Sequence, residues 1–189
     1  MKRHSEVVSH DVRANPARPI CFSLFVILVL AVIGCSQRTT EDWTALLARI
    51  RSEFPAVDQL PTEELARWLV EGREVVLLDT RSNEEYEVSH LEGALHAETV
   101  EQATEILERS ASSPIVVVYC SVGYRSSALA TQLMRRGFKV YNLEGSIFKW
   151  ANEGRPLYRD GLPVEEVHPY DSTWGRFLSS RLWQKDSSQ

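Results

Sequence analysis

A cysteine stands where a hydrophobic run, "IVVVYC", changes into a short polar loop. A thiol in this position is either a small hydrophobic residue that ends a buried strand or a nucleophile placed to react. The residues that would form a binding loop with Cys120 are Ser121, Val122, Gly123, Tyr124, Arg125 and Ser126. A helical pattern begins at about Arg125 or Ser126, so the loop is short. The chemistry of this loop bears on both roles.

A short connection from a strand to a helix is suited to binding an anion. It can direct several backbone N–H groups inward, and the N-terminus of the following helix adds a partial positive charge. A free thiol has a pKa of about 8.5, which a helix N-terminus and a nearby arginine lower to about 3.5–7.5. Gly123 gives the backbone freedom that a tight loop needs, and Arg125 offers a planar fork to a bound oxyanion. The loop alone leaves both roles open, so the hypothesis of a nucleophilic Cys120 in an anion-binding loop needs support from the rest of the sequence.

The other cysteines support this hypothesis. Cys21 lies inside an uncharged apolar segment and Cys35 ends that segment. If Cys35 is lipidated, Cys120 has no intramolecular disulfide partner. Exported proteins usually pair their structural cysteines, so a lone thiol is a candidate for a reactive one. The histidines and cysteines lack the spacing of a metal site, so we expect neither a metal nor another cofactor.

The N-terminal segment predicts export. Basic residues precede the uncharged stretch Ile20 to Cys35, as in a signal sequence. As a helix this stretch is too short for the hydrocarbon thickness of about 30 Å. Its end, "VIGC", resembles the bacterial lipobox, which implies cleavage before Cys35 and lipidation of its thiol. The alternative is an uncleaved signal anchor, because the basic segment is long for a signal. Both alternatives predict a cell-envelope protein, attached to the membrane, with its domain on the periplasmic or external side.

Strand and helix patterns alternate along the rest of the chain. The runs "EVVLLD", "IVVVYC" and "KVYNL" lack polar alternation, which is typical of strands covered on both faces. Helical spacing extends from Pro61 to near Gly72, from Thr99 to Ser110, from about Arg125 to Gly137, and from about Ile147 to near Gly154. The alternation predicts a single α/β domain around a mainly parallel sheet flanked by helices.

Two further segments flank this domain. Residues 36–57 are predicted to form a linker and an amphipathic helix, and residues 159–189 a C-terminal extension, with residues 1–35 as the export signal and 58–158 as the main domain. A cap at Asp171, Ser172 or Thr173 can start a short amphipathic helix, whose apolar residues are Trp174, Phe177, Leu178 and Leu182. We expect its apolar face to lie on the domain, the alternative being contact with the membrane or a partner.

Composition excludes one class of partner. The 189 residues carry a net charge of −5. Nucleic-acid binding requires basic patches to meet phosphates, so we expect no nucleic-acid partner.

Residues 58–158 resemble the rhodanese-like domain family in four separated elements that occur in order. These are Asp79 and Arg81 of an Asp-x-Arg element, Glu85 and Tyr86 of an acidic-aromatic pair, the turn with His90, Leu91, Gly93 and Ala94, and the loop Cys120 to Arg125. The resemblance implies a five-stranded parallel sheet and a six-residue loop that begins with the catalytic cysteine. Ser89 and Glu92 stand where the family often has glycine and proline, in a turn away from the loop.

The resemblance implies a sulfurtransferase. Cys120 would take a sulfur atom from a small donor, thiosulfate or a persulfide, and pass it to cyanide or to a thiol acceptor, including a protein thiol. Asp79 and Arg81 would support the loop, with Arg81 able to reach the mouth of the pocket, whereas His90 would be structural. Ser121 and Val122 are neutral, which disfavours thiosulfate as the natural donor.

Two alternatives remain open. Related domains whose loop is one residue longer are phosphatases or arsenate reductases, and the four residues between Cys120 and Arg125 suit a smaller group than phosphate. The other alternative is a non-catalytic binding or sensing module of the cell envelope that keeps the fold.

Overall fold

The structure is a computed structural model that describes residues 42–110 and 114–184. The predicted export segment, with Cys21 and the lipidation candidate Cys35, lies outside the described residues. None of the helices in the described part is both long and apolar enough to cross a bilayer.

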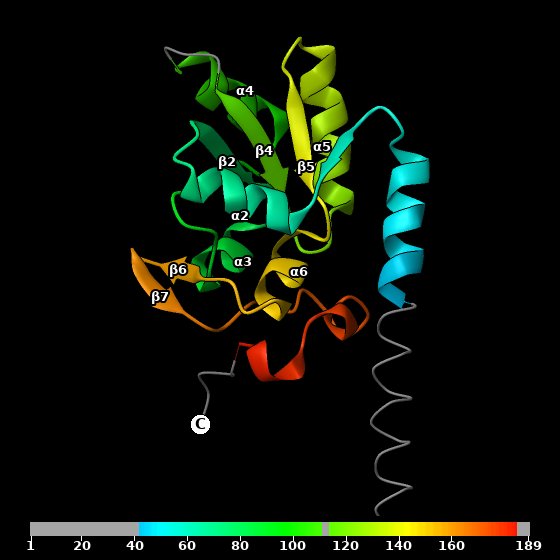
Figure 1. The fold of residues 1–189 in the computed structure, drawn as a ribbon, viewed down its shortest axis with the longest axis vertical. Helices are drawn as coiled ribbons and strands as arrows, with labels where there is room; N and C mark the ends of the chain where they lie inside the picture. Colours follow the sequence, from blue (N-terminus) through cyan, green and yellow to red (C-terminus); the bar gives the residue numbers. More distant parts are fainter. Residues whose placement is uncertain (1–41, 111–113, 185–189) are drawn as a thin grey trace, which may run out of the picture. The chain divides into compact units, whose positions relative to one another are not determined.

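A five-stranded sheet forms the centre of the domain, and all of its strands are parallel (Figure 1). The strands are β1 (Asp58–Leu60), β2 (Val75–Asp79), β3 (Leu95–His96), β4 (Ile115–Tyr119) and β5 (Val140–Leu143). Their order across the sheet is β1-β5-β4-β2-β3, so β4 is the central strand. The predicted parallel α/β fold is confirmed.

Helices connect the strands, because parallel neighbours need a crossover rather than a tight turn. They are α2 (Thr62–Val70), α3 (Asn83–Val88), α4 (Val100–Glu108), α5 (Tyr124–Arg135) and α6 (Ser146–Asn152), and residues 42–53 form a further helix. Capping boxes start α3 at Ser82 and Glu85 and α4 at Thr99 and Gln102.

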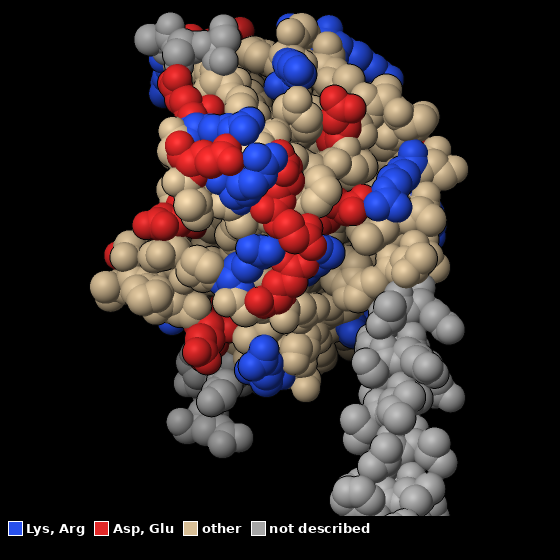
Figure 2. Space-filling view, viewed as in Figure 1, with Lys and Arg blue, Asp and Glu red and all other residues tan. Residues whose placement is uncertain are grey.

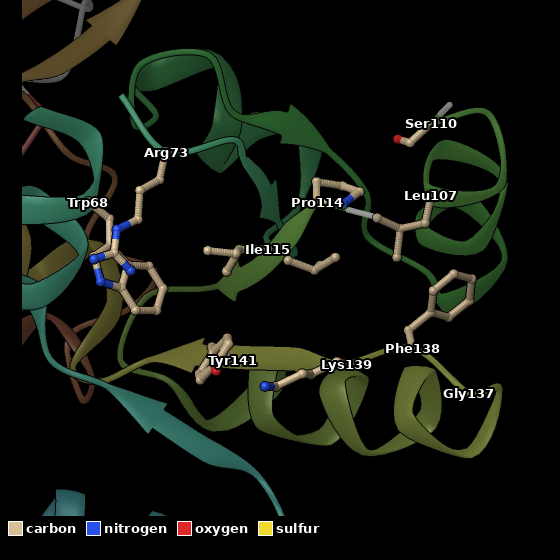
Figure 3. Close-up of a pocket in the computed structure, with 11 residues that line it drawn as sticks. Trp68, Arg73, Leu107, Ser110, Pro114, Ile115, Gly137, Phe138, Lys139 and Tyr141 are labelled. Atoms are coloured by element: carbon tan, nitrogen blue, oxygen red, sulfur yellow. The ribbon is translucent and has the colours of Figure 1, made fainter. Parts of the chain in front are cut away.

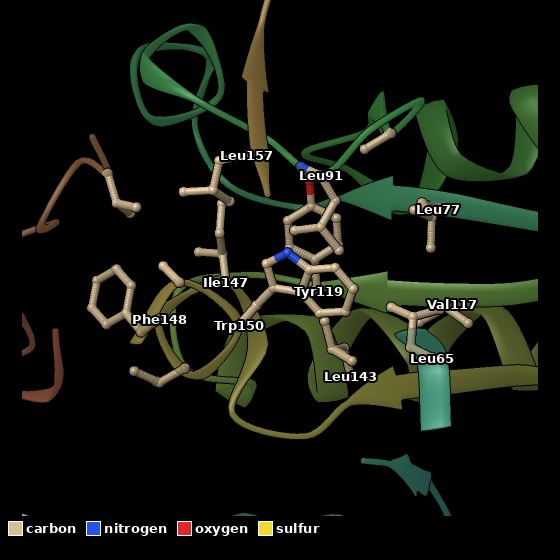
Figure 4. Close-up of a cluster of buried hydrophobic side chains, with 14 of the residues drawn as sticks. Leu65, Leu77, Leu91, Val117, Tyr119, Leu143, Ile147, Phe148, Trp150 and Leu157 are labelled. Atoms are coloured by element: carbon tan, nitrogen blue, oxygen red, sulfur yellow. Dashed lines mark hydrogen bonds between the residues drawn. The ribbon is translucent and has the colours of Figure 1, made fainter. Parts of the chain in front are cut away.

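Strand β4 is apolar throughout because both faces of the sheet are covered. Val117 and Tyr119 belong to one hydrophobic cluster, and Val116 and Val118 to another. The first cluster includes side chains of α2 and α6 (Figure 4), and the second those of α4 and α5. Alternate residues of a strand point to opposite faces, so a doubly covered strand needs hydrophobic residues at every position.

The outer surfaces of α2 and α6 carry paired charges. Acidic and basic side chains are interleaved on this face (Figure 2). Among them, Arg67 contacts Glu64, and Lys149 Nζ donates to Glu153 Oε1 at 2.5 Å. Thr62 Oγ1 donates to Glu153 Oε2 at 2.8 Å, which links the two helices. Exposed pairs of this kind contribute at most about 1 kcal/mol each, so burial of the two clusters dominates stability.

An unpredicted β-hairpin joins the main domain to the C-terminal extension. Strands β6 (Leu157–Arg159) and β7 (Leu162–Val164) pair antiparallel. The two residues between them, Asp160 and Gly161, have φ of 53° and 75°. An Asp-Gly pair with positive φ at both positions is a preferred two-residue hairpin turn, so the sequence held a signal that was overlooked.

The extension then folds back on the domain as two 3₁₀-helices, η1 (Gly175–Phe177) and η2 (Ser180–Leu182). Asp171 Oδ1 accepts hydrogen bonds from the backbone N–H groups of Thr173 and Trp174, both at 2.8 Å, as a cap would. The single continuous helix predicted here is wrong, because the backbone is extended at Leu178. The apolar side chains Phe177, Leu178 and Leu182 are nevertheless buried against the domain, as expected.

Candidate functional site

The candidate site lies at the carboxyl edge of the sheet, where β2 and β4 end side by side. Asp79 pairs in register with Tyr119, and the Thr80 N–H donates to the Tyr119 carbonyl at 2.9 Å. Cys120 follows Tyr119 directly and is only 1% exposed. Helix α5 begins at Tyr124, one or two residues before the predicted start at about Arg125 or Ser126, so the loop enters the helix without a longer connection.

Helix α6 binds two carbonyl groups of the loop. The N–H groups of Ile147 and Phe148 donate to the carbonyls of Cys120 and Ser121, both at 3.1 Å. Because these two carbonyls point to α6, they do not face the thiol, and backbone N–H groups of the loop can do so. The Gly123 N–H donates to Cys120 Sγ at 3.2 Å. Of the several inward-facing donors that the sequence predicts, the Gly123 N–H makes this hydrogen bond to the thiol.

Ser146 holds the first peptide of the loop and was not identified from the sequence. Its Oγ accepts a hydrogen bond from the Cys120 N–H and donates to the Leu143 carbonyl, each at 3.1 Å. Ser146 has a φ of 51°, which is uncommon outside glycine. Uncommon backbone conformations concentrate at functional sites. The serine that follows Gly145 at the start of this helical pattern was the available signal.

Gly123 is required by the backbone of the loop. Its φ is 107°, and a Cβ atom there would lie 3.1 Å from Asn142 Nδ2. Asn142 is fully buried, accepts a hydrogen bond from Ser126 Oγ at 2.6 Å and donates to Gln59 at 2.7 Å. An asparagine inside the apolar run of β5 was a second signal that sequence reasoning missed, since a buried amide needs partners.

Arg125 is bound to the protein itself. Its Nη1 and Nη2 donate to the two carboxylate oxygens of Glu85, both at 2.8 Å, and Nη2 also donates to Ser121 Oγ at 2.9 Å. The Ser121 hydroxyl in turn donates to Glu85 at 2.8 Å. The side chain of Glu85 is 2% exposed. The guanidinium fork predicted to face a bound oxyanion is thus occupied by Glu85.

The electrostatic surroundings favour the thiolate form of Cys120. Burial alone would raise the pKa of the thiol, but the Arg125 guanidinium, the Ser126 hydroxyl and the N–H groups of Ser126 and Gly123 outweigh burial and lower the pKa. Burial would also raise the pKa of Glu85, but its bonds from Arg125 and Ser121 keep that pKa below the ordinary value. Glu85 is therefore an ionised partner, and Cys120 can act as a nucleophile.

Asp79 and Arg81 form a buried ion pair beneath the loop. Both side chains are fully buried, and Arg81 Nη2 donates to Asp79 Oδ2 at 2.6 Å and to the Ser89 carbonyl at 2.5 Å. The pair connects the end of β2 to the turn after α3, next to Tyr119. Arg81 is not among the described residues that line the cavity at Cys120. The expectation that Arg81 reaches the mouth is therefore wrong, whereas its contacts fit the expected supporting role.

The His90 side chain contacts Tyr86. Its ring stacks on Tyr86 with centroids 4.1 Å apart, and its Nδ1 lies 3.1 Å from the Tyr86 carbonyl. These contacts fit the structural role expected for His90.

A cavity of about 210 Å³ opens at Cys120. Its lining consists of Cys120, Ser121, Val122, Tyr124 and Arg125 with two residues of the C-terminal extension, Tyr170 and Trp174. A larger hollow of about 700 Å³ lies at the opposite end of the sheet, where β4 begins at Ile115 (Figure 3). Cys120 lies at the other end of β4, so the smaller cavity is the candidate site.

Comparisons with known proteins agree with this geometry. Residues 61–153 match the family model described as a rhodanese-like domain. The tRNA uridine(34) hydroxylases of Salmonella heidelberg and Salmonella agona are 34% identical over 124 residues, which cover 60% of this chain and 34% of each relative. The chain thus spans about a third of the length of these curated relatives.

Two solved structures share the fold. A thiosulfate sulfurtransferase of Pseudomonas aeruginosa has a TM-score of 0.54 at 21% identity, over 70% of this chain and 26% of that chain. The BH2092 protein of Bacillus halodurans has a TM-score of 0.52 at 18% identity, over 62% of this chain and 88% of that chain. Together with the sheet order and the cysteine loop, these matches establish that residues 61–153 are a rhodanese-like domain.

Proposed function

We propose that this protein is a sulfurtransferase that carries a sulfur atom on Cys120. The observation that carries the proposal is the thiol itself, which has a lowered pKa and accepts a backbone hydrogen bond at the floor of a small cavity. The donor would be a persulfide or thiosulfate, and the acceptor a thiol or cyanide. The rhodanese-like domain family and the solved sulfurtransferase of the same fold support this class of reaction.

Each half-reaction is a displacement at sulfur. The Cys120 thiolate attacks the outer sulfur of the donor, a new S–S bond forms, and the old S–S bond breaks with its electron pair leaving on the thiolate or sulfite. The Gly123 N–H donates to Sγ and so stabilises the Cys120 thiolate, both before the attack and when the acceptor has removed the outer sulfur. The acceptor then attacks the outer sulfur and regenerates the Cys120 thiolate. Two half-reactions at one residue predict ping-pong kinetics.

Phosphoryl chemistry is less well supported. A phosphoryl dianion is best held by a bidentate guanidinium fork. The fork of Arg125 already bonds both oxygens of Glu85, and the loop has only four residues between Cys120 and Arg125.

The test uses the full chain with Cys21→Ser and Cys35→Ser, in which Cys120 is the remaining thiol. After incubation with thiosulfate or an organic persulfide, we expect the intact mass to rise by one sulfur atom and cyanide to release thiocyanate. The matched Cys120→Ser chain should show neither change. Turnover of an aryl phosphate with no sulfur adduct from any donor would overturn the proposal in favour of phosphatase chemistry.

We also propose that the domain is exported and held at the cell membrane, through lipidation at Cys35 or through an uncleaved anchor. The support is the order of three features in residues 1–35: basic residues, then an uncharged apolar stretch, then the sequence "VIGC". In the Cys35→Ala chain, a lipoprotein should lose processing and membrane association, whereas an anchored protein should keep its membrane association. Recovery of the wild-type chain in the cytoplasm would refute both forms.

A further inference from the structure

The outer wall of the cavity comes from outside the rhodanese-like domain. Tyr170 and Trp174, which we call the aromatic wall, lie beyond the matched residues 61–153. The segment that carries them is fixed to the domain. Asn152 of α6 donates to the Phe177 carbonyl at 2.7 Å and accepts from the Ser179 N–H at 2.8 Å. The wall is therefore a built part of the site.

The backbone holds Tyr170 in an unusual conformation. Its φ is 68°, which is a genuine outlier for a bulky side chain and costs about 1–3 kcal/mol. The Tyr170 N–H donates to His168 Nδ1 at 3.0 Å. In this conformation the ring lies 4.7 Å from the guanidinium carbon of Arg125. Tyr170 thus covers a face of the guanidinium group whose edge is bound to Glu85.

The cavity presents little free positive charge to a substrate. Of the seven described residues that line it, Arg125 alone carries a positive charge, and that charge is paired with Glu85. A dianion such as thiosulfate would lose hydration in this cavity without gaining a free cation. The side chains of Val122 and Tyr124 and the aromatic wall offer apolar and aromatic contacts instead. Volume is sufficient, because an apolar cavity of about 150 Å³ holds benzene.

We propose that the aromatic wall makes this site selective for an organic persulfide, with an apolar or aromatic group on its inner sulfur, over thiosulfate. This inference rests on the proposed sulfurtransferase function and names its donor. Cys120 attacks the outer sulfur, the S–S bond of the donor breaks, and the organic thiolate leaves with the bonding electron pair. Its apolar group stays against Tyr170 and Trp174 while Cys120 keeps the transferred sulfur.

The experiment compares benzyl persulfide with thiosulfate as donors for the full chain with Cys21→Ser and Cys35→Ser. The rate of sulfur addition to Cys120 is followed by rapid quenching and intact mass at several donor concentrations. We expect the wild-type wall to give the larger second-order rate constant with benzyl persulfide. Tyr170→Ala and Trp174→Ala should each lower that constant by about three- to tenfold, the range for losing an aromatic pair, and should change the thiosulfate constant by a smaller factor.

Two controls separate selectivity from folding. Tyr170→Phe should keep the wild-type preference, because the ring remains. Tyr158→Ala removes a tyrosine of β6 that is not among the described cavity residues, and should change neither constant. A faster wild-type reaction with thiosulfate, or an equal fall for both donors in the wall variants, would overturn the donor assignment while leaving a sulfurtransferase. Absence of any sulfur adduct from either donor would instead overturn the proposed function, and this inference with it.

Discussion

Arg125→Gln should weaken the fold and make the Cys120 thiol less reactive at neutral pH. The variant leaves the buried carboxylate of Glu85 without its cation, although Ser121 Oγ and the Ser82 N–H still donate to it. We expect a loss of about 1–3 kcal/mol in the free energy of unfolding, the cost of an under-satisfied buried group. Breaking a fully buried ion pair costs about 3–5 kcal/mol. The loss for Arg125→Gln should be smaller, because the Arg125 side chain is 35% exposed.

The effect on the thiol has a definite sign. Among the groups that lower the pKa of Cys120, the Arg125 guanidinium is the strongest, so its removal should raise that pKa. The pH midpoint of iodoacetamide alkylation, followed by intact mass in the chain with Cys21→Ser and Cys35→Ser, should therefore move upward. The double variant Glu85→Gln, Arg125→Gln removes both charges. It should recover much of the stability and return the midpoint only part of the way.

The stability loss should itself depend on pH. The folded-state pKa of Glu85 lies below its ordinary value of 4.5, so its ionised form stabilises the fold above that pH. This contribution disappears as the pH falls through the lower folded value. The gap in urea-unfolding free energy between wild type and Arg125→Gln should therefore narrow as the pH falls below 4.5. A constant gap across this range, or an unmoved alkylation midpoint, would contradict the assigned role of Arg125.

The parts of the site that the sequence predicted are those encoded locally. The apolar run before Cys120 identifies a doubly covered strand, and the short distance to the next helical pattern identifies the loop. Gly123 could be assigned to this loop because a tight connection needs the backbone freedom of glycine. These features depend on neighbouring residues, so a pattern in one window of the sequence is sufficient to detect them.

The missing parts depend on contacts between distant segments. Glu85 was recognised as part of a motif, but its pairing with Arg125 could not be chosen among 26 acidic and 21 basic residues. Tyr170 reaches the cavity only because the C-terminal extension folds back on α6 through Asn152. The predicted helix after Asp171 gave way to two 3₁₀-helices because burial of Phe177 and Leu182 against the domain outweighs local helix propensity.

Asp79→Ala should cause the largest loss of stability. Burial would lower the pKa of Arg81, but Asp79 outweighs burial and raises it, so Arg81 is charged in the folded protein. Without Asp79, a guanidinium group that is 0% exposed keeps its hydrogen bond to the Ser89 carbonyl but loses the carboxylate that contacts it. We expect a loss of about 3–5 kcal/mol in the free energy of unfolding, measured in urea. Because a domain of this size has only about 5–15 kcal/mol in total, Asp79→Asn provides a milder second variant.

The matched control for Asp79→Ala is the double variant Asp79→Leu, Arg81→Met. Replacing both members of a buried pair by hydrophobic side chains is often neutral or stabilising, so this variant should recover most of the lost stability. The pair also fixes the end of β2 beside Tyr119, the residue before the thiol. A recovered stability with slowed alkylation of Cys120 would therefore assign the pair to positioning the loop. A loss below about 1 kcal/mol for Asp79→Ala, typical of an exposed pair, would contradict the buried ion pair itself.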